Sequence, residues 1–313
     1  MTQYVLRRLV VLPIVLFGVS VLVFMVLHLV PGNPAQVIAG PDAPPETVAQ
    51  IERELGLDRP LPEQYARYIG RVLQGDLGRS LRSRRPVLDD VMDALPNTLQ
   101  LTLVAAIITP LIAIPLGVIA AARRGTRVDR GLMLLSMLGI TVPVFAIALG
   151  FMWSFGYQLR WFPISGYGGP IWTFDGLRSV ALPALTLAVG AVAALARLTR
   201  SAMLEVLNQD FVRTARAKGL RERVVLARHG LANALLPVIT VLGLQIALLL
   251  SGAFVTETVF AWPGVGRLAV FAIQGRDFPL VQGTVLVIAV LFVLVNLVVD
   301  VMYAYVDPRI HYQ

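Results

Sequence analysis

The sequence predicts an all-α integral membrane protein, from its composition, the length of its apolar runs and the distribution of its charges. Hydrophobic residues make up 57% of the 313-residue chain and charged residues only 15%, which is too apolar for a soluble domain. A helix needs roughly 20 apolar residues to cross about 30 Å of hydrocarbon. Because lipid offers backbone groups no water, we expect a helix wherever such a run occurs, and no run alternates as a barrel strand does. Six runs qualify, at residues 9–30, 98–122, 132–157, 180–198, 236–259 and 280–305.

The first run follows Arg7 and Arg8, as the apolar core of a secretory signal would. A signal core, however, spans roughly 7–15 apolar residues and ends at a small-residue cleavage site. This run is longer and ends in Leu-Val-Pro-Gly-Asn-Pro. We therefore expect residues 1–30 to form a retained first transmembrane helix.

Residues 31–96 are the one sizeable polar stretch, and we expect them to form a small external helical domain. Proline and helical periodicity predict a helix over 45–55 that ends at Gly56, and a second helix over 63–73. The second helix has three apolar side chains on one face, namely Tyr65, Ile69 and Val72. This domain is either a cap packed on the helix bundle or a platform that receives an external partner.

Residues 97–313 carry the other five runs and one long cytosolic loop at 199–235. Prolines inside these runs predict kinks, because the ring removes a backbone donor and clashes with the preceding turn. They are Pro110, Pro115, Pro143 and Pro183. The external loop at 160–178 is dense in glycine, proline and aromatic residues, which either anchor at the lipid headgroups or contact a partner. The candidates for partner contact are Trp161, Tyr167 and Trp172.

The charges follow the membrane. With a cytosolic N-terminus, the inside segments carry +9 and the outside segments −1, which together give the net +8 of the chain. This is the positive-inside pattern, and it places both termini in the cytosol. It also accounts for the high pI without nucleic acid, because no basic stripe with interleaved aromatics lies outside the pattern. Membrane lipid is the expected surrounding.

The most informative segment is a basic insert at 210–237, between the fourth and fifth runs. Asp210 is predicted to be the N-cap of a short helix that runs to Lys218, and Gly219 supplies a left-handed stop. A Leu-Leu-Pro sequence that ends at Pro237 then leads back into the membrane. A juxtamembrane patch on anionic lipid would explain the charge, but it would not explain this cap, stop and re-entry.

The short helix is predicted to have two faces. An apolar face carries Phe211, Val212 and Ala215, and the small alanine lets a partner come close. Arg213 and Arg216 lie three residues apart on the other face, where they can reach carboxylates or carbonyls of a partner. Two turns of helix are too short to be stable alone. A neighbouring element must therefore hold this helix.

The sequences RTARAKGL at 213–220 and NALLP at 233–237 resemble the EAA motif of the membrane subunits of binding-protein-dependent ABC importers. At the position of the motif's glutamate this chain has Arg213, which narrows the resemblance to the dipeptide and oligopeptide branch of that family. Most of the chain shares the resemblance, including LGLDRPLPEQYARYI at 55–69, TETVFAWPGVGRL at 256–268 and NLVVDVMYAYVDPRI at 296–310.

The resemblance implies a type I ABC importer permease in the bacterial plasma membrane. It implies a heterodimer with a second, homologous permease, two cytosolic ATPase subunits that bind ATP and Mg²⁺, and an extracytoplasmic peptide-binding protein. The substrate is a dipeptide, an oligopeptide, glutathione or a nickel chelate. The residues assigned to ATPase coupling are Asp210, Arg213, Ala215, Arg216, Lys218, Gly219 and Pro237.

The residues themselves exclude several other functions. Lys218 is the only lysine and is followed by Gly219, so the chain has no phosphate-binding P-loop and we expect it to bind no cofactor. It has no cysteine, hence no disulfide or thiolate metal site. It has no HExxH, GxSxG or SxxK motif, which argues against an intramembrane enzyme. A scaffold subunit without a path of its own stays open.

An ion-driven secondary transporter is the main alternative, but it would normally have acidic residues at the centre of its spans, and this chain has none there. Polar residues do occur within or near the spans. They either line the translocation path or bond to a neighbouring helix. They are Thr141, Thr240, Gln245, Glu257 and Asn296.

Overall fold

The computed structural model describes residues 2–29, 34–40 and 43–306, and in this part the secondary structure is helical apart from one isolated bridge between Arg79 and Pro86. The chain divides into two compact units. The N-terminal unit comprises residues 1–96 and 264–294, and the central unit comprises residues 97–263 and 295–313. The end of the predicted first span at residue 30 and the last seven residues, 307–313, lie outside the described residues.

Four helices of the described residues are long and apolar enough to cross a membrane, or five if one bent pair counts as a span. They confirm an all-α, multi-pass membrane protein. The four are at Val87–Ala122, Phe174–Leu207, Glu222–Leu250 and Phe278–Val299, and the bent pair joins Arg127–Thr141 to Val144–Gln158. In the first predicted span, the searched residues give a shorter apolar helix, Leu12–Met25.

The N-terminal unit contains α1 to α4, the start of α5, α12 and most of α13. Its first helices end where the sequence predicts, because Gly56 takes the left-handed conformation (φ 69°) that ends α3. A proline in the first turn starts α4 two residues earlier than expected. The bounds are Thr2–Leu29 for α1, Pro34–Ala39 for α2, Pro45–Leu55 for α3, Leu61–Leu73 for α4, Val87–Ala122 for α5, Val265–Gln274 for α12 and Phe278–Val306 for α13.

Contacts between α1 and α4 and among α5, α12 and α13 help to hold this unit together. Tyr65 of α4, on the predicted apolar face, packs edge-on against Phe17 and Phe24 of α1, and its hydroxyl lies 2.7 Å from the Ser20 hydroxyl. Elsewhere α5, α12 and α13 share an apolar core, whose buried members are Val87, Val91, Ala94, Val265, Ala272 and Leu280.

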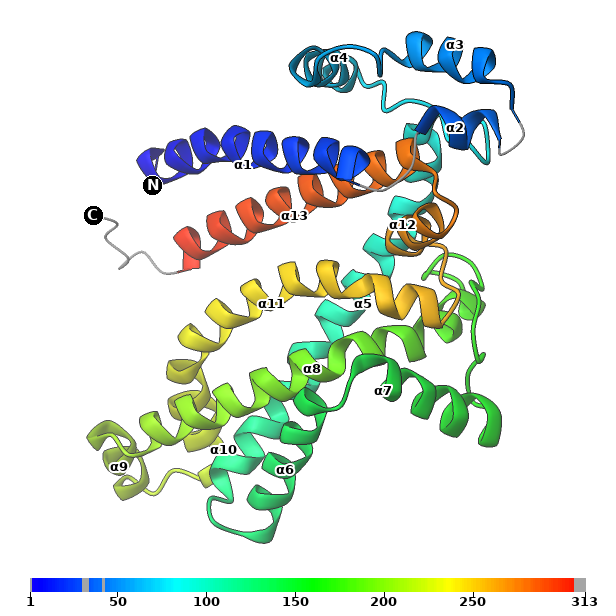
Figure 1. The fold of residues 1–313 in the computed structure, drawn as a ribbon. Coiled ribbons are helices and arrows are strands. Elements are labelled where there is room, and N and C mark those ends of the chain that lie inside the picture. The colour runs from blue at the N-terminus through cyan, green and yellow to red at the C-terminus, as the bar shows by residue number, and fades with distance from the viewer. Residues whose placement is uncertain (1, 30–33, 41–42, 307–313) are drawn as a thin grey trace. The chain divides into compact units, whose positions relative to one another are not determined.

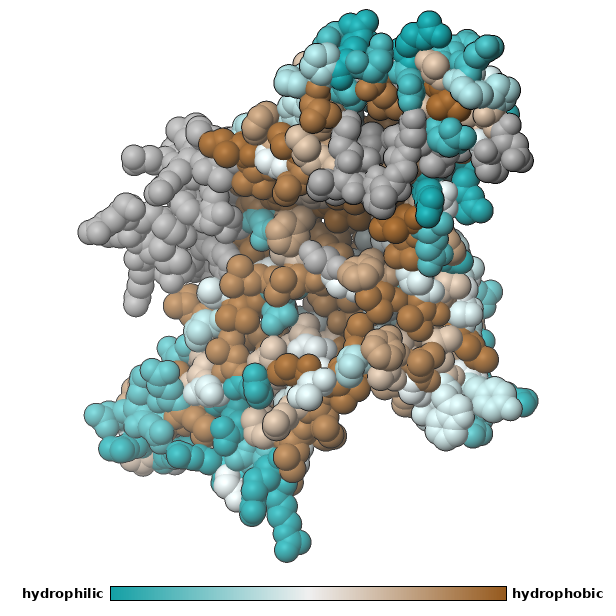
Figure 2. All heavy atoms as spheres, in the orientation of Figure 1, coloured by the Kyte–Doolittle hydropathy of each residue, from teal (hydrophilic) through white to brown (hydrophobic). Residues whose placement is uncertain are grey.

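The central unit is built around α8. In its apolar 18-residue stretch 67% is buried, whereas the corresponding value for α5 is 28%. Helices α6, α7 and α11 all pack on α8 (Figure 1). Hydrophilic atoms gather around α9 in this unit, whereas hydrophobic atoms cover much of the helical surface beside it (Figure 2). The bounds are Arg127–Thr141 for α6, Val144–Phe151 for α7, Met152–Gln158 for the π-helix η1, Phe174–Leu207 for α8, Asp210–Ala217 for α9, Glu222–Val224 for α10, Val225–Leu231 for the π-helix η2 and Ala232–Val259 for α11.

The predicted kink at Pro143 is a break. Helices α6 and α7 meet there at 110°, so the expected single helix over 132–157 is two shorter ones. Val142 takes an extended conformation (ψ 128°), as a residue before proline prefers, and Pro143 is the N-cap residue of α7. By contrast, Pro110 lies inside the long α5 and Pro183 inside the long α8.

Candidate functional site

Helix α9 is held by its neighbours through the apolar face that the sequence predicts. Val212 and Ala215 are buried (0% and 5% exposed) in a cluster with Met203 of α8 and Val225 of η2. Phe211 lies at the edge of this face and is 40% exposed. A two-turn helix that is unstable alone is therefore stabilised by tertiary contacts with α8 and η2.

The predicted cap of α9 is wrong by one residue. Gln209 occupies the N-cap position with an extended backbone (φ −78°, ψ 153°) and makes no side-chain cap bond. Asp210 is the first helical residue, and its carboxylate accepts a hydrogen bond from Arg213 at 3.2 Å. A carboxylate at this position still interacts favourably with the helix dipole, which explains why Asp210 suits either place.

The other end of α9 follows the prediction closely. The helix ends at Ala217, Lys218 is the exposed C-cap, and Gly219 has the predicted left-handed conformation with φ 76°. Arg216 reaches across this turn to Glu222 with two hydrogen bonds, of 2.8 and 3.2 Å, which raise the pKa of Arg216. The Arg213 side chain is 73% exposed. Arg213 and Lys218 are therefore exposed cations that can meet a partner, while Arg216 also fastens the turn.

The segment after α9 is more helical than the sequence suggests. A continuous helix begins at Glu222, well before the expected span at 236–259, and Pro237 lies inside α11 as an exposed residue. The π-helix η2 packs against α8 through Gly230, where an added Cβ would lie only 2.9 Å from the Met203 side chain. Thus α9 is followed by an ordered helix that lies close to α8.

The candidate path residues lie on separate elements. Thr141, at the end of α6 beside the break, and Thr240 of α11 are exposed, and each hydroxyl donates to the carbonyl four residues earlier, at 2.9 and 3.0 Å. Gln245 and Asn296 are half-buried. Glu257 is fully buried and accepts a 2.7 Å hydrogen bond from the Thr98 hydroxyl. At least three of the five thus bond within or between helices.

The sequence does not reveal that Glu257 belongs to a larger polar connection between α5 and the end of α11. The indole of Trp262, fully buried, donates to the Asn97 carbonyl at 2.9 Å. The Asn97 amide donates in return to the Pro263 carbonyl at 3.0 Å. One sequence feature could have pointed to these contacts: Glu257 lies at the end of an apolar run, and a glutamate rarely stays buried without a partner.

The loop over residues 160–178, here called the aromatic loop, is attached to this connection. Tyr167 packs edge-on against Trp262 with ring centroids 5.0 Å apart, and the Ile171 amide donates to the Gln100 side chain at 3.0 Å. Trp161 and Trp172 are 57% and 78% exposed. The loop is therefore anchored through Tyr167 and presents the two tryptophans outward.

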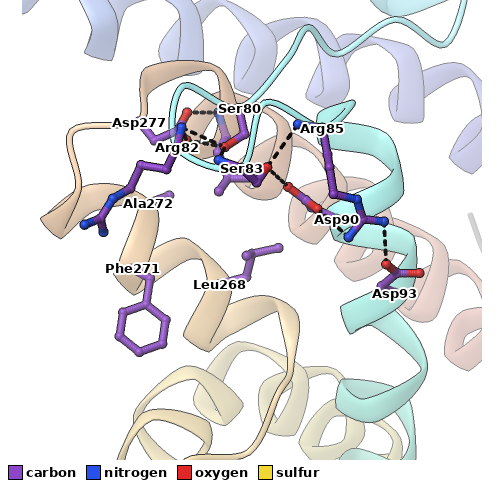
Figure 3. Close-up of a pocket in the computed structure, with 11 residues that line it drawn as sticks. Ser80, Arg82, Ser83, Arg85, Asp90, Asp93, Leu268, Phe271, Ala272 and Asp277 are labelled. Carbon is purple, nitrogen blue, oxygen red and sulfur yellow. Dashed lines mark hydrogen bonds and ion pairs between the residues drawn. The ribbon is translucent and has the colours of Figure 1, made fainter. Parts of the chain in front are cut away.

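A second polar feature that the sequence does not reveal lies in the N-terminal unit. Asp277, fully buried before α13, accepts hydrogen bonds from the Ser80 hydroxyl at 2.5 Å and the Arg82 amide at 3.2 Å, so it fixes the loop over 80–85 (Figure 3). Arg85 of this loop pairs with Asp93 at 2.8 Å. Beside the loop is an open cavity of about 260 Å³ with an apolar side formed by Leu268, Phe271, Ala272 and Leu280.

A third is a buried ion pair in the central unit. Arg200 of α8 makes two hydrogen bonds to Asp129 of α6, Nε to Oδ1 at 2.6 Å and Nη2 to Oδ2 at 2.8 Å. Asp129 is 3% exposed. In the sequence both residues contribute only to net charge, and their separation of 71 positions hides the pairing.

Comparison with known proteins gives two family matches that together cover nearly the whole chain. Residues 113–312 match the binding-protein-dependent transport system inner membrane component family, and residues 1–102 match its N-terminal family. The dipeptide transport system permease protein DppB of Alkalihalophilus pseudofirmus is 40% identical over the whole of both chains. The glutathione transport system permease protein GsiC is 44% identical in Salmonella paratyphi A and 42% in Escherichia coli O6:H1, again over the whole of both chains.

Proposed function

This chain belongs to the family of binding-protein-dependent transport system inner membrane components, and we propose that it is the permease subunit of an ATP-driven importer of small peptides. It is a multi-pass membrane protein that acts in transport and not as an enzyme. Full-length similarity to dipeptide and glutathione permeases supports a peptide substrate. An ion-driven secondary transporter is not favoured, because the family that matches residues 113–312 is that of binding-protein-dependent transport systems.

The chain forms half of the translocation path, beside a second, homologous permease. Six spans are proposed, with residues 31–96 as an external domain, residues 97–313 as the core and both termini in the cytosol. The distribution of charge supports this orientation, with +9 inside and −1 outside. The path residues are proposed to be Thr141, Thr240, Gln245, Glu257 and Asn296.

Helix α9 is proposed to be the point where the cytosolic ATPases act. The observation that carries this assignment is how α9 packs: Val212 and Ala215 are buried against α8 and η2, while Arg213 is largely exposed. ATP and Mg²⁺ belong to two partner ATPase subunits. Their closure moves α9 as a rigid body, and its packing on α8 passes the displacement to the core helices, so that the path opens to each side in turn.

The loop with Trp161, Tyr167 and Trp172 is proposed to contact the extracytoplasmic peptide-binding protein. Exposed tryptophans on an anchored loop suit this purpose, because rigid aromatic side chains supply contact area at low entropic cost. The binding protein delivers the peptide, and it makes much of the choice between dipeptides, longer peptides, glutathione and nickel chelates.

The decisive test is charge reversal on α9. In vesicles that hold the full complex, R213E/R216E should abolish ATP-dependent uptake of labelled di- and tripeptides and of glutathione, while ATP hydrolysis by the partner subunits becomes independent of peptide. R123E, at an exposed arginine on the turn between α5 and α6, should transport as the wild type does. Unchanged uptake by R213E/R216E would reject the assignment of α9. Uptake by the wild type that follows an ion gradient and needs no ATP would reject the importer itself.

A further inference from the structure

The ion pair between Asp129 and Arg200 joins the first turn of α6 to α8. Its geometry is bidentate, with both carboxylate oxygens engaged at 2.6 and 2.8 Å. Such pairs fix orientation as well as distance, because the planar guanidinium matches the carboxylate. The side chains are only 4% and 24% exposed, so water screens them little.

Asp129 also closes the turn between α5 and α6. Its Oδ2 atom accepts a hydrogen bond from the Gly125 amide at 2.9 Å, and its own amide donates to the Thr126 hydroxyl at 3.4 Å. Thr126 is the N-cap of α6. One carboxylate therefore ties together the end of α5, the start of α6 and α8.

Arg200 lies on the part of α8 that carries α9. One turn further along, Met203 belongs to the buried cluster that seats Val212 and Ala215. One turn earlier, α8 crosses α5 so closely that a Cβ on Gly117 would lie 2.7 Å from the Ala196 carbonyl oxygen. Helices α9, α8 and α5 are thus joined by tight apolar packing. Helix α6 also packs on α8, and the ion pair adds a charged contact at its first turn.

Helix α6 leads from this pair to the break at Val142–Pro143. The helix is continuous over Arg127–Thr141, and α7 lies at 110° to it beyond the break. Apolar contacts between helices tolerate small sliding movements. A bidentate ion pair does not, so it holds the first turn of α6 in register with α8.

We propose that the Asp129–Arg200 pair is the strut that makes α6 move with α9 and α8, and so carries displacement of α9 to the break before α7. Asp129 and Arg200 are positioning residues for coupled transport, and this inference rests on the proposed function. A pair that only stabilised the fold would change the amount of assembled complex and leave the transport of each assembled complex unaltered. The strut changes the number of peptides moved per ATP hydrolysed.

The first experiment compares D129A/R200A with R123A in vesicles that hold the full complex. The double variant removes both charges, so it leaves no unpaired charge buried. Peptide uptake per ATP hydrolysed should fall at least about fivefold, the lower end of typical couplings between sites, while the ATPases remain bound. R123A should match the wild type. An unchanged ratio in D129A/R200A overturns the strut.

The second experiment replaces the strut with a reversible covalent link. The chain has no cysteine of its own, and an added Cβ on Gly139 of α6 would lie 3.1 Å from the Ala193 Cβ of α8, close to the roughly 3.5–4.5 Å that a disulfide spans. Oxidised G139C/A193C should transport normally if α6 and α8 move as one body. In the D129A/R200A background, oxidation should restore the lost ratio and reduction should remove it again.

These arms separate the possible failures. Inhibition of G139C/A193C by oxidation, relieved by reductant, would show that α6 must move against α8 and would overturn the strut, even if the D129A/R200A complex did not assemble. Absence of ATP-dependent uptake by the wild-type complex would instead reject the proposed function.

Discussion

At the scale of single residues, three buried carboxylates are stabilised in three different ways. Asp129 is paired with a guanidinium, Glu257 accepts from the Thr98 hydroxyl, and Asp277 accepts from the Ser80 hydroxyl and from the Leu280 amide at the start of α13. Burying a carboxylate is costly unless such partners meet it. Each of the three joins segments far apart in the chain, so each fixes tertiary structure that apolar packing alone would leave less specific.

Two neighbouring tyrosines of α4 give a prediction at this scale. The Tyr65 hydroxyl lies 2.7 Å from the Ser20 hydroxyl, whereas the buried Tyr68 hydroxyl has no hydrogen-bond partner among the described residues. We expect Y65F to lower the stability of the packing between α1 and α4 by about 1 kcal/mol, and Y68F to raise it by about 1 kcal/mol. Proteolysis of the detergent-solubilised protein, followed against temperature, measures both.

The pH dependence provides an independent check. Burial raises the pKa of Tyr68 from 10.0 to about 12, with a smaller effect from Tyr65. The unfolded phenol therefore ionises first, and wild-type stability should fall as the pH rises from about 10 to about 12. Y68F should lose less over the same range. Equal losses in the two proteins would contradict the buried state of Tyr68.

At the scale of elements, the sequence predicts best those features that depend on local chemistry. Gly56 and Gly219 end α3 and α9 as predicted, because a left-handed residue after a helix is a local requirement. The two-faced character of α9 follows from spacing alone. The predicted N-cap of α9 is wrong by one residue, because Gln209 and Asp210 are both compatible with a helix start. The backbone conformation that decides between them is set by the end of α8.

Features that depend on distant segments are not predictable in this way. The Asp129–Arg200 pair, the Asn97–Trp262 contact and the Ser80–Asp277 contact each join positions more than 70 residues apart. Pro143 predicts a kink but not a break of 110°, because the angle depends on how α7 packs against α8 and α11. The candidate coupling helix could therefore be located from the sequence, while the contacts that hold it in the bundle could not.

The crossing of α5 and α8 gives a prediction for these elements. A Cβ on Gly117 would lie 2.5 Å from the Thr199 Cβ, whereas one on Gly131 of α6 would meet nothing within 4 Å. G117A should therefore destabilise the central unit by about 1–3 kcal/mol through overpacking. G131A should stabilise it by up to about 1 kcal/mol, because alanine favours a helix. Thermal unfolding in detergent compares them, and a G117A protein as stable as G131A would show that the helices are not packed this closely.

At the scale of the whole molecule, the orientation in the membrane decides whether α9 can meet ATPases at all. Six proposed spans leave the exposed Lys218 in the cytosol and the exposed Ser165 of the aromatic loop outside. The charges argue for this orientation, since the segments assigned to the cytosol carry +9 and the others −1. An inverted molecule would place the basic α9 outside, against the positive-inside rule.

The natural absence of cysteine makes this orientation directly measurable. In intact cells, a membrane-impermeant thiol reagent should label S165C at once, and K218C only after the membrane is permeabilised. Q74C, at an exposed position just after α4, should behave as S165C does if residues 31–96 form an external domain. Labelling of K218C from outside would remove α9 from the reach of any cytosolic ATPase. The proposed topology has two spans between residues 74 and 165, namely α5 and the α6–α7 pair, so it places both residues on the same side of the membrane. Labelling of S165C together with protection of Q74C would place them on opposite sides. That result would leave α9 in the cytosol but would require an odd number of spans between residues 74 and 165.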